Sequence, residues 1–218
     1  MTSQEEILEG IRKAVINYDE KMATDLAKKV IDEGVNPLTA IEEGLAKGIK
    51  VVGDKFEKQE IFLPHIVLAS DVMKKALEVL EPHLKKGETR SVSGKIVIGT
   101  VQGDIHDIGK NIVRTMLDAS GFQTFDIGCD APTSKFIEKA QEVNADIIAA
   151  SALMTTSMYG QRDLVEELRK MGLKDSFRIL IGGGLTSKDW AEEIGADGYA
   201  EDAIQAVKVA EKIVKGEK

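Results

Sequence analysis

The spacing of apolar residues changes near residue 95 of this 218-residue chain, and that change limits the fold more than any other feature. Before it, apolar residues recur every three or four positions, as they do in amphipathic helices. After it, short apolar runs alternate with helical patterns, as they do in α/β proteins. Residues 85–94, between the two regions, include small and charged side chains and no large apolar cluster, which is typical of a linker. We therefore predict two domains, residues 1–88 and residues 89–218.

The first domain is predicted to be a four-helix bundle. Asn36 and Pro37 mark the start of its third helix, because asparagine caps helix N-termini and proline suits the first helical position. A break at residues 58–62 separates the third helix from the fourth. Short connections between amphipathic helices favour an up-down arrangement. The four apolar stripes are Ile7, Ile11 and Val15; Met22, Leu26 and Val30; Leu38, Ile41, Leu45, Ile49 and Val52; and Ile66, Ala69, Met73, Ala76 and Leu80.

The second domain is predicted to be a doubly wound parallel sheet of five strands, of the flavodoxin or Rossmann-like type. Its order is expected to be 2-1-3-4-5, which places a ligand crevice beyond the carboxyl ends of the first and third strands. The apolar runs are residues 95–101, 122–128, 146–153, 177–183 and 198–200. Helical patterns follow them near residues 109–120, 134–143, 157–171 and 188–194, and again at the end of the chain.

Composition narrows the classes of function. The net charge of −8 argues against nucleic acid and against an anionic membrane surface, because both attract basic proteins. A single cysteine, Cys129, excludes an intrachain disulfide and fits a reducing compartment. We find neither a signal peptide nor an apolar stretch approaching the ~20 residues that span a bilayer. The expected location is therefore the cytoplasm.

Three loops at the predicted crevice hold the unusual residues. His106 lies between two aspartates, and a metal-bound imidazole usually donates its other N–H to a carboxylate, for which Asp104 is the nearest candidate. One histidine makes a poor zinc site, which needs three or four protein ligands. It suits a metal that brings its own macrocycle, a haem or a corrin. The loops are Gly103–Gly109, Ser151–Ser157 and Gly182–Gly184.

Other interpretations of these loops remain open at this point. A lone histidine is often a surface residue, Ser157 can simply cap the next helix, and a glycine run can be only a tight turn. A flavin mononucleotide site would need a phosphate loop rich in serine or threonine after the first strand, where this chain has aspartates that repel phosphate. A response regulator would need a phosphoacceptor aspartate after the third strand, where Ser151 and Leu153 stand.

The three loops together resemble the cobalamin-binding domain family. The pattern Asp-x-His-x-x-Gly ends at Gly109, and 41 residues lie between Gly109 and Ser151, where Ser-x-Leu begins. Another 28 residues lie between Leu153 and Gly182, where Gly-Gly begins. The bundle half resembles the cap domain of the methyl-transferring members, which include B12-dependent methionine synthase, through residues 52–56 and 62–64. The resemblance therefore covers nearly the whole chain. The two longer loops look most like those of corrinoid methyl-carrier proteins of methylamine-type methyltransferase systems.

The resemblance implies a role for each motif residue. His106 would bind cobalt in place of the cofactor's own base, with Asp104 and Ser157 forming a hydrogen-bonded relay behind it. His65 departs from the family, because methyl-carrier caps often have glutamine there. The residues implied to contact a cobalamin or related corrinoid are Gly103, Asp104, Ile105, His106, Asp107, Ile108, Gly109, Ser151, Leu153, Thr155, Ser157, Gly182, Gly183 and Gly184, with Phe56, Leu63 and Ile66 covering the upper face.

The resemblance also implies partners. Cobalt would alternate between Co(I) and methyl-Co(III), and the chain shows no substrate pocket of its own, so it would be a carrier that is inactive alone. It would need a donor methyltransferase, an acceptor methyltransferase using a thiol coenzyme or tetrahydrofolate, and a reductive activase. A methylamine is the expected donor; methanol, betaine and methoxy-aromatic donors remain alternatives. The subunit of an adenosylcobalamin isomerase lacks such a cap, and a cobalamin-dependent sensor would need a signalling segment.

Overall fold

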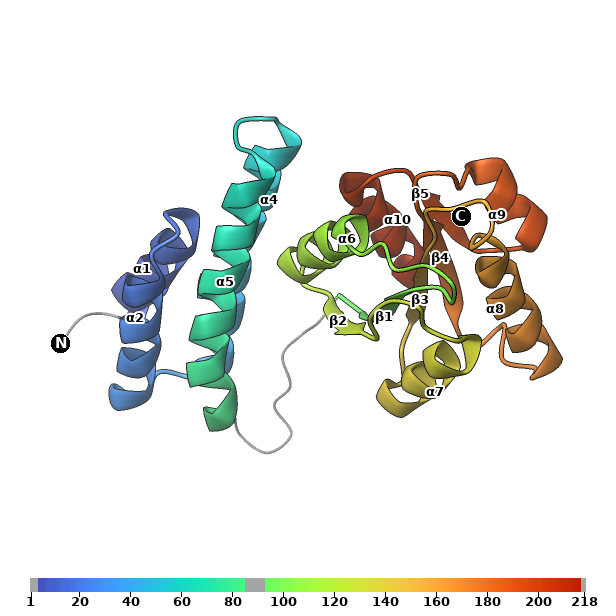
Figure 1. The fold of residues 1–218 in the computed structure, drawn as a ribbon. Coiled ribbons are helices and arrows are strands. Elements are labelled where there is room, and N and C mark those ends of the chain that lie inside the picture. The colour runs from blue at the N-terminus through green and yellow to red at the C-terminus, as the bar shows by residue number, and fades with distance from the viewer. Residues whose placement is uncertain (1–3, 85–92, 217–218) are drawn as a thin grey trace. The chain divides into compact units, whose positions relative to one another are not determined.

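The computed structural model describes residues 4–84 and 93–216, and the chain divides into two compact units, residues 1–91 and 92–218 (Figure 1). The first unit is helical, and the second contains a five-stranded sheet with helices around it. These are the two kinds of unit that the change in apolar spacing predicts. The predicted boundary after residue 88, and most of the predicted linker, lie outside the described residues.

The first unit is a bundle of four helical segments in its described part. Asn36 caps the third segment as predicted, because its side chain accepts hydrogen bonds from the Leu38 and Thr39 N–H groups at 2.7 and 3.3 Å. That segment includes a stretch of π-helix, which the sequence pattern does not predict. The bounds are α1 (Gln4–Ile16), α2 (Glu20–Asp32), α3 (Pro37–Thr39) continuing through η1 (Ala40–Ala46) into α4 (Lys47–Glu57), and α5 (Leu63–Leu80) followed by the 3-10 turn η2 (Glu81–His83).

Small residues set the packing of this bundle. A side chain at Gly44 would meet Ile11 at 2.9 Å, and one at Gly48 would meet Val15 at 2.9 Å, so the two glycines let the third segment approach α1 closely. The stripe predicted for α2 is partly wrong. Its buried residues are Ala23, Ala27 and Val30, whereas Met22 is exposed. Close helix contact buries alanine here, and the larger side chain stays outside.

The second unit is a parallel sheet with strand order β2-β1-β3-β4-β5, as predicted. Strands alternate with helices along the chain. Each helix returns the chain to the end of the sheet at which all the strands begin. The strands are β1 (Lys95–Thr100), β2 (Gln123–Asp126), β3 (Ile147–Ser151), β4 (Arg178–Gly182) and β5 (Gly198–Ala200). The helices are α6 (Ile108–Ala119), α7 (Thr133–Val143), α8 (Tyr159–Lys170), α9 (Lys188–Ile194) and α10 (Ala203–Lys215).

Helices cover both faces of this sheet (Figure 1). On the face toward α7, α8 and α9, which we call the packed face, alternate strand residues join one large core cluster with Phe136, Leu164 and Trp190. The other face lies toward α6 and α10, and we call it the hollow face. Because side chains alternate along a strand, Ser151 and Gly182, paired across β3 and β4, belong to the hollow face.

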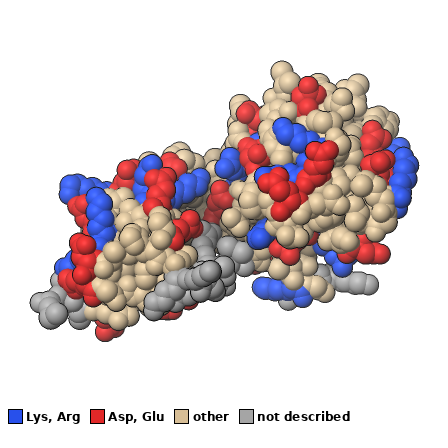
Figure 2. All heavy atoms as spheres, turned by 90° about the horizontal axis from the view of Figure 1, so that it is seen from below, with Lys and Arg blue, Asp and Glu red and all other residues tan. Residues whose placement is uncertain are grey.

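The surface agrees with the acidic composition. In the view of Figure 2, acidic and basic side chains of the described residues are interspersed, without a continuous basic patch. Among the helices of the described residues, none is long and apolar enough to cross a membrane.

Candidate functional site

The loop between β1 and α6 holds Asp104 at its centre. Asp104 is fully buried, and it accepts a hydrogen bond from the ring Nδ1 of His106 at 2.7 Å and from the His106 main-chain N–H at 3.0 Å. Thr100, the last residue of β1, donates its hydroxyl to the His106 carbonyl at 2.9 Å. Gly103 supplies a left-handed turn, with φ of +81°, that an L-residue rarely adopts. These contacts fix the histidine at the end of β1.

The protonation state of Asp104 decides which histidine nitrogen is free. Burial alone raises the pKa of a carboxyl group, but the four hydrogen bonds to Asp104 outweigh burial and hold its pKa well below the usual range. Asp104 is therefore a carboxylate, which only accepts hydrogen bonds. In a neutral His106 imidazole the proton then lies on Nδ1, which leaves a lone pair on Nε2. The His106 side chain is 50% exposed, so Nε2 is available to a ligand.

The loop after β3 completes the setting of Asp104. The Ser157 hydroxyl donates to Asp104 Oδ2 at 2.6 Å, and the Leu153 N–H donates to the same oxygen at 2.7 Å. Ser157 is buried and lies two residues before α8, so it serves Asp104 instead of capping that helix. The chain of hydrogen bonds expected from Ser157 through Asp104 to His106 is present.

The glycines after β4 bring the main chain against the same loop. A Cβ built on Gly183 would lie 1.7 Å from the Ala152 carbonyl oxygen, and its φ is +129°. Only glycine fits this position. A Cβ on Gly182 would lie 2.9 Å from the Ala200 carbonyl oxygen, so β5 also approaches closely. The glycine run therefore packs main chain on main chain at the end of β3 and β4.

A cavity of about 650 Å³ opens beside His106 on the hollow face. Ten of the predicted site residues line it: Ile105, His106, Asp107, Ile108, Gly109, Ser151, Leu153, Gly182, Gly183 and Gly184. Asp104 and Ser157 stand behind the histidine, and Gly103 shapes the loop. Thr155 is exposed and does not line the cavity, so its predicted contact with a corrinoid stays a prediction.

Sequence reasoning missed a large part of the lining. The α6 residues Lys110, Ile112 and Val113 form one wall, and the start of α10 forms another. Their types give no functional signal, because alanine and aliphatic residues at helical spacing equally predict a packed core. The strand order does give a signal, because it places β5 beside β4 at the crevice. The other missed lining residues are Ile98, Ala149, Ala150, Leu180, Ile181, Ala200, Glu201, Asp202, Ala203 and Ala206.

The donor set fits a metal that brings its own macrocycle. In residues 4–84 and 93–216, no three His, Cys, Asp or Glu side chains cluster closely enough to hold a metal ion, so His106 would be a single protein ligand. Large apolar side chains line the same cavity as His106 and are exposed: Ile105 and Ile108 are 78% and 76% exposed, and Leu153 is also exposed. Such an apolar rim would be covered by the flat face of a macrocycle.

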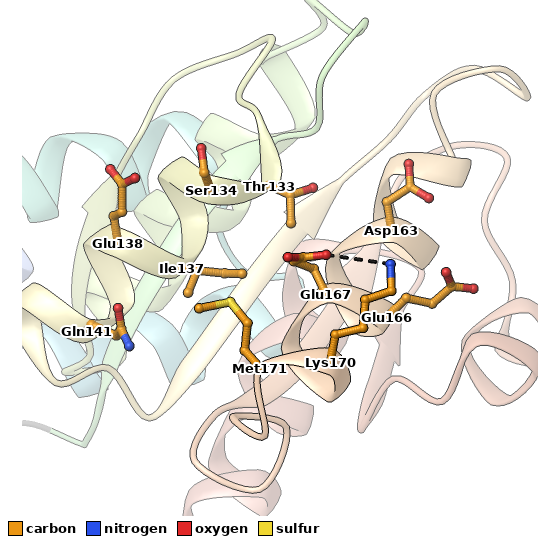
Figure 3. A pocket seen from close by; sticks show the side chains of 10 residues that line it. All are labelled: Thr133, Ser134, Ile137, Glu138, Gln141, Asp163, Glu166, Glu167, Lys170 and Met171. Carbon is orange, nitrogen blue, oxygen red and sulfur yellow. Dashed lines mark ion pairs between the residues drawn. The ribbon is translucent and has the colours of Figure 1, made fainter.

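A second cavity lies between α7 and α8 and has a different character (Figure 3). Ile137 and Met171 lie toward each other at its centre, and acidic side chains from both helices stand around them. Lys170 pairs with Glu167 at 3.6 Å. None of the predicted site residues lines this cavity. The histidine and the glycine run therefore belong to the hollow-face cavity alone.

The bundle residues predicted to cover a cofactor differ in exposure. Ile66 is fully buried among the core residues of α5, and Phe56 and Leu63 are half-buried. Phe62, which the site prediction omitted, is 72% exposed. His65 accepts a hydrogen bond from the Phe62 N–H at its Nδ1, at 3.2 Å, and so serves the start of α5. Contact of the bundle residues with a cofactor stays a prediction.

Taken together, the sheet, the single histidine with its buried carboxylate, and the adjoining cavity define a cofactor-binding α/β protein of the switch-point type. Two family models described as B12 binding domain match the chain, over residues 94–208 and 7–81. The amino-acid sequence of this chain is 48% identical to that of a corrinoid protein of Desulfitobacterium hafniense, over 95% of this chain and 97% of that protein. It is 43% identical to trimethylamine corrinoid protein 1 of Methanosarcina acetivorans, over 95% and 96% of the two chains.

A solved structure is similar over both units. It is a chain of the methanol:cobalamin methyltransferase complex of Methanosarcina barkeri, which aligns with a TM-score of 0.89 and 30% identity over 99% of this chain and 82% of that chain. The protein belongs to the family of B12-binding corrinoid proteins, and its cofactor is cobalamin or a related corrinoid. The fold predicted from the sequence is confirmed in both units.

Proposed function

We propose that this chain is a methyl carrier that holds its corrinoid through His106, with the cofactor's own base displaced into the hollow-face cavity. The observation that carries the proposal is the setting of His106: Asp104 occupies Nδ1, and the half-exposed imidazole lies beside the cavity. A corrinoid bound there would supply the methyl-transfer chemistry. Every other task falls to the protein's own residues.

Those residues hold the lower side of the cofactor. Asp104 keeps the proton on Nδ1 and fixes the plane of the imidazole, and Ser157 in turn fixes Asp104. Ile105, Ile108 and Leu153 offer an apolar surface that excludes water around the ligand nitrogen. This arrangement favours one rotamer of a neutral imidazole before the cofactor arrives, which lowers the entropic cost of binding.

We propose a methylamine as the methyl source, with a donor methyltransferase, an acceptor methyltransferase and a reductive activase as partners. Support comes from the trimethylamine relative and from the likeness to a methyltransferase complex. The likeness to the methanol complex keeps methanol as a second candidate. The donors can be ranked by the rate of methyl transfer to the reconstituted protein. The assay would compare mono-, di- and trimethylamine and methanol, each with its own donor methyltransferase.

The ligand assignment has a direct test. Reconstituted protein carrying ¹⁵N-labelled histidine, reduced to Co(II), should show spin coupling of cobalt to a protein nitrogen, and His106→Ala should abolish it. His83→Ala, which changes an exposed histidine of η2, is the matched control and should retain the coupling. Asp104→Asn should keep the coupling and weaken binding or activity about 10- to 100-fold, as changes behind a metal ligand do. Coupling to the cofactor's own base in the wild type would overturn the assignment.

A further inference from the structure

The inner part of the hollow-face cavity is lined by hydrocarbon. Ser151 and Gly182 are paired at the mouth, where the strands end. Two residues deeper on the same face, Ile98, Ala149 and Leu180 lie side by side, because Ala149 is paired with Ile98 on one side and with Leu180 on the other. All three line the cavity, and all three are buried. The sheet therefore supplies a floor that is polar only at its outer edge.

The two helical walls, like the floor, are apolar in the inner part of the cavity and polar at the mouth. In α6, Ile112 and Val113 lie one turn inside the helix start, and in α10 Ala206 does. Asp107 and Asp202 are the N-cap residues of the two helices, so their carboxylates stand at the mouth. Glu201 precedes Asp202 on the same loop. The acidic lining residues are thus confined to the rim.

Lys110 is the remaining charged residue of the lining, and its ammonium group is occupied. It donates to both Asp126 oxygens at 2.8 Å and to Asn111 Oδ1 at 2.8 Å. Three hydrogen bonds use all three ammonium hydrogens. Within the described lining, the inner part of the cavity therefore presents no free side-chain donor or acceptor to a ligand.

A corrinoid tail ends in an aromatic base, and these bases differ in polarity. A phenol-type base is linked through its oxygen and ends in hydrocarbon, and a benzimidazole leaves one ring nitrogen unpaired when it leaves cobalt. Adenine adds two further ring nitrogens and an exocyclic amine. Each polar group that is buried without a partner costs a large part of its hydration free energy. We propose that this cavity selects corrinoids whose tail base is apolar, of the benzimidazole or phenol class, against those with a purine base.

This proposal rests on the proposed function, because it assumes that the tail enters the cavity. The test is binding of three corrinoids to the full chain, followed by the change in visible absorption: cobinamide, which has no tail base; cobalamin; and the adenine-containing cobamide. Wild type should bind cobalamin about 10- to 100-fold more tightly than the adenine form, which corresponds to one unpaired group at ~1–3 kcal/mol. Cobinamide serves as the reference without a base.

Polar variants of the inner lining test the cause. Leu180→Gln should narrow the gap between cobalamin and the adenine form several-fold by offering a donor and an acceptor, and Leu180→Met, of similar length and apolar, should preserve it. Val113→Thr adds a hydroxyl at nearly constant shape and provides a second variant if Leu180→Gln does not fold. Unchanged cobinamide binding would show that each variant retains the rest of the site.

The outcomes separate the two proposals. Equal affinity of the wild type for cobalamin and the adenine form would overturn base selection and leave corrinoid binding intact. A gap that neither polar variant narrows would overturn the hydrocarbon lining as its cause. Failure of the wild type to bind any of the three corrinoids, cobinamide included, would instead contradict the proposed function itself.

Discussion

The two faces of the sheet bury their residues in different ways. On the packed face, large side chains such as Phe136, Leu164 and Trp190 fill the space between the sheet and α7, α8 and α9. On the hollow face, Ala149, Gly182 and other small residues leave a cavity of about 650 Å³ under α6 and α10. One sheet thus stabilises the unit through one face and keeps room for a ligand on the other. Changes on the packed face should affect folding, and changes on the hollow face should affect binding.

One buried residue connects the two functions. Gln161 of α8 is fully buried, and its Nε2 donates to the Ala150 carbonyl at 2.9 Å and to the Gly182 carbonyl at 3.0 Å. Its Oε1 accepts from the Trp190 indole at 3.0 Å. The core of the packed face is therefore tied by hydrogen bonds to the strand ends that border the cavity.

The largest effect on stability should come from removing a large side chain from the packed face. Phe136→Ala should lower the free energy of unfolding by about 3–5 kcal/mol, because it leaves a cavity in a filled core. Leu180→Ala, on the hollow face, should cost less, since its side chain already borders open space. Chemical denaturation of the corrinoid-free proteins would measure both. Equal losses of unfolding free energy in the two variants would show that the two faces do not differ in their contribution to stability.

Substitution in the glycine run should have the next largest effect on stability. Gly183→Ala should cost about 3 kcal/mol, because its Cβ would collide with the Ala152 carbonyl at a φ of +129°. Gly184→Ala is the matched control, since a Cβ there meets only the flexible end of Leu153, at 2.7 Å. Thermal unfolding and corrinoid titration of both variants would test this. Similar behaviour of the two would show that the close approach at Gly183 is not essential.

Loss of the hydrogen bonds of the Gln161 side chain should lower the free energy of unfolding by about 2 kcal/mol. Gln161→Met removes the donor to two carbonyls and leaves the buried Trp190 indole N–H without its acceptor. Trp190→Phe removes that N–H, so in a double-mutant cycle the two changes together should cost less than their sum. Additive losses would mean that the two side chains are not coupled. A loss of corrinoid affinity in Gln161→Met beyond the loss of stability would link the packed face to the cavity.

These residues also show how far the sequence alone leads. The strand order and the position of His106, Asp104 and Ser157 follow from the alternating pattern and the motif spacing, because a parallel sheet brings the carboxyl ends of β1 and β3 together. The buried face of α2 does not follow, because hydropathy ranks Met22 above Ala23, whereas close helix packing favours the smaller side chain. Cavities are hard to predict for the same reason: small residues lining a cavity look like small residues in a core.

The smallest effect concerns a charge pair at the border of the hollow face, Lys110 with Asp126. Burial alone raises the pKa of Asp126, but the Lys110 ammonium, the Gly128 N–H and Arg114 outweigh it, and the pKa is lowered. A carboxyl group with a lowered pKa stabilises the fold above its unfolded pKa of about 3.9, and this contribution is lost as the pH falls through the folded pKa.

Lys110→Met should therefore lower the free energy of unfolding by about 1 kcal/mol at pH 7, and the difference from wild type should shrink as the pH falls from about 5 toward 3. Lys139→Met is the control, because Lys139 pairs with Glu142 at 2.8 Å on the exposed side of α7, where an ion pair contributes little. Denaturation at pH 7, 5, 4 and 3 would measure both variants. A deficit in Lys110→Met that persists unchanged at pH 3 would mean that its aliphatic stem, packed along the cavity wall, matters more than its charge, and the hollow face would then depend on packing as the opposite face does.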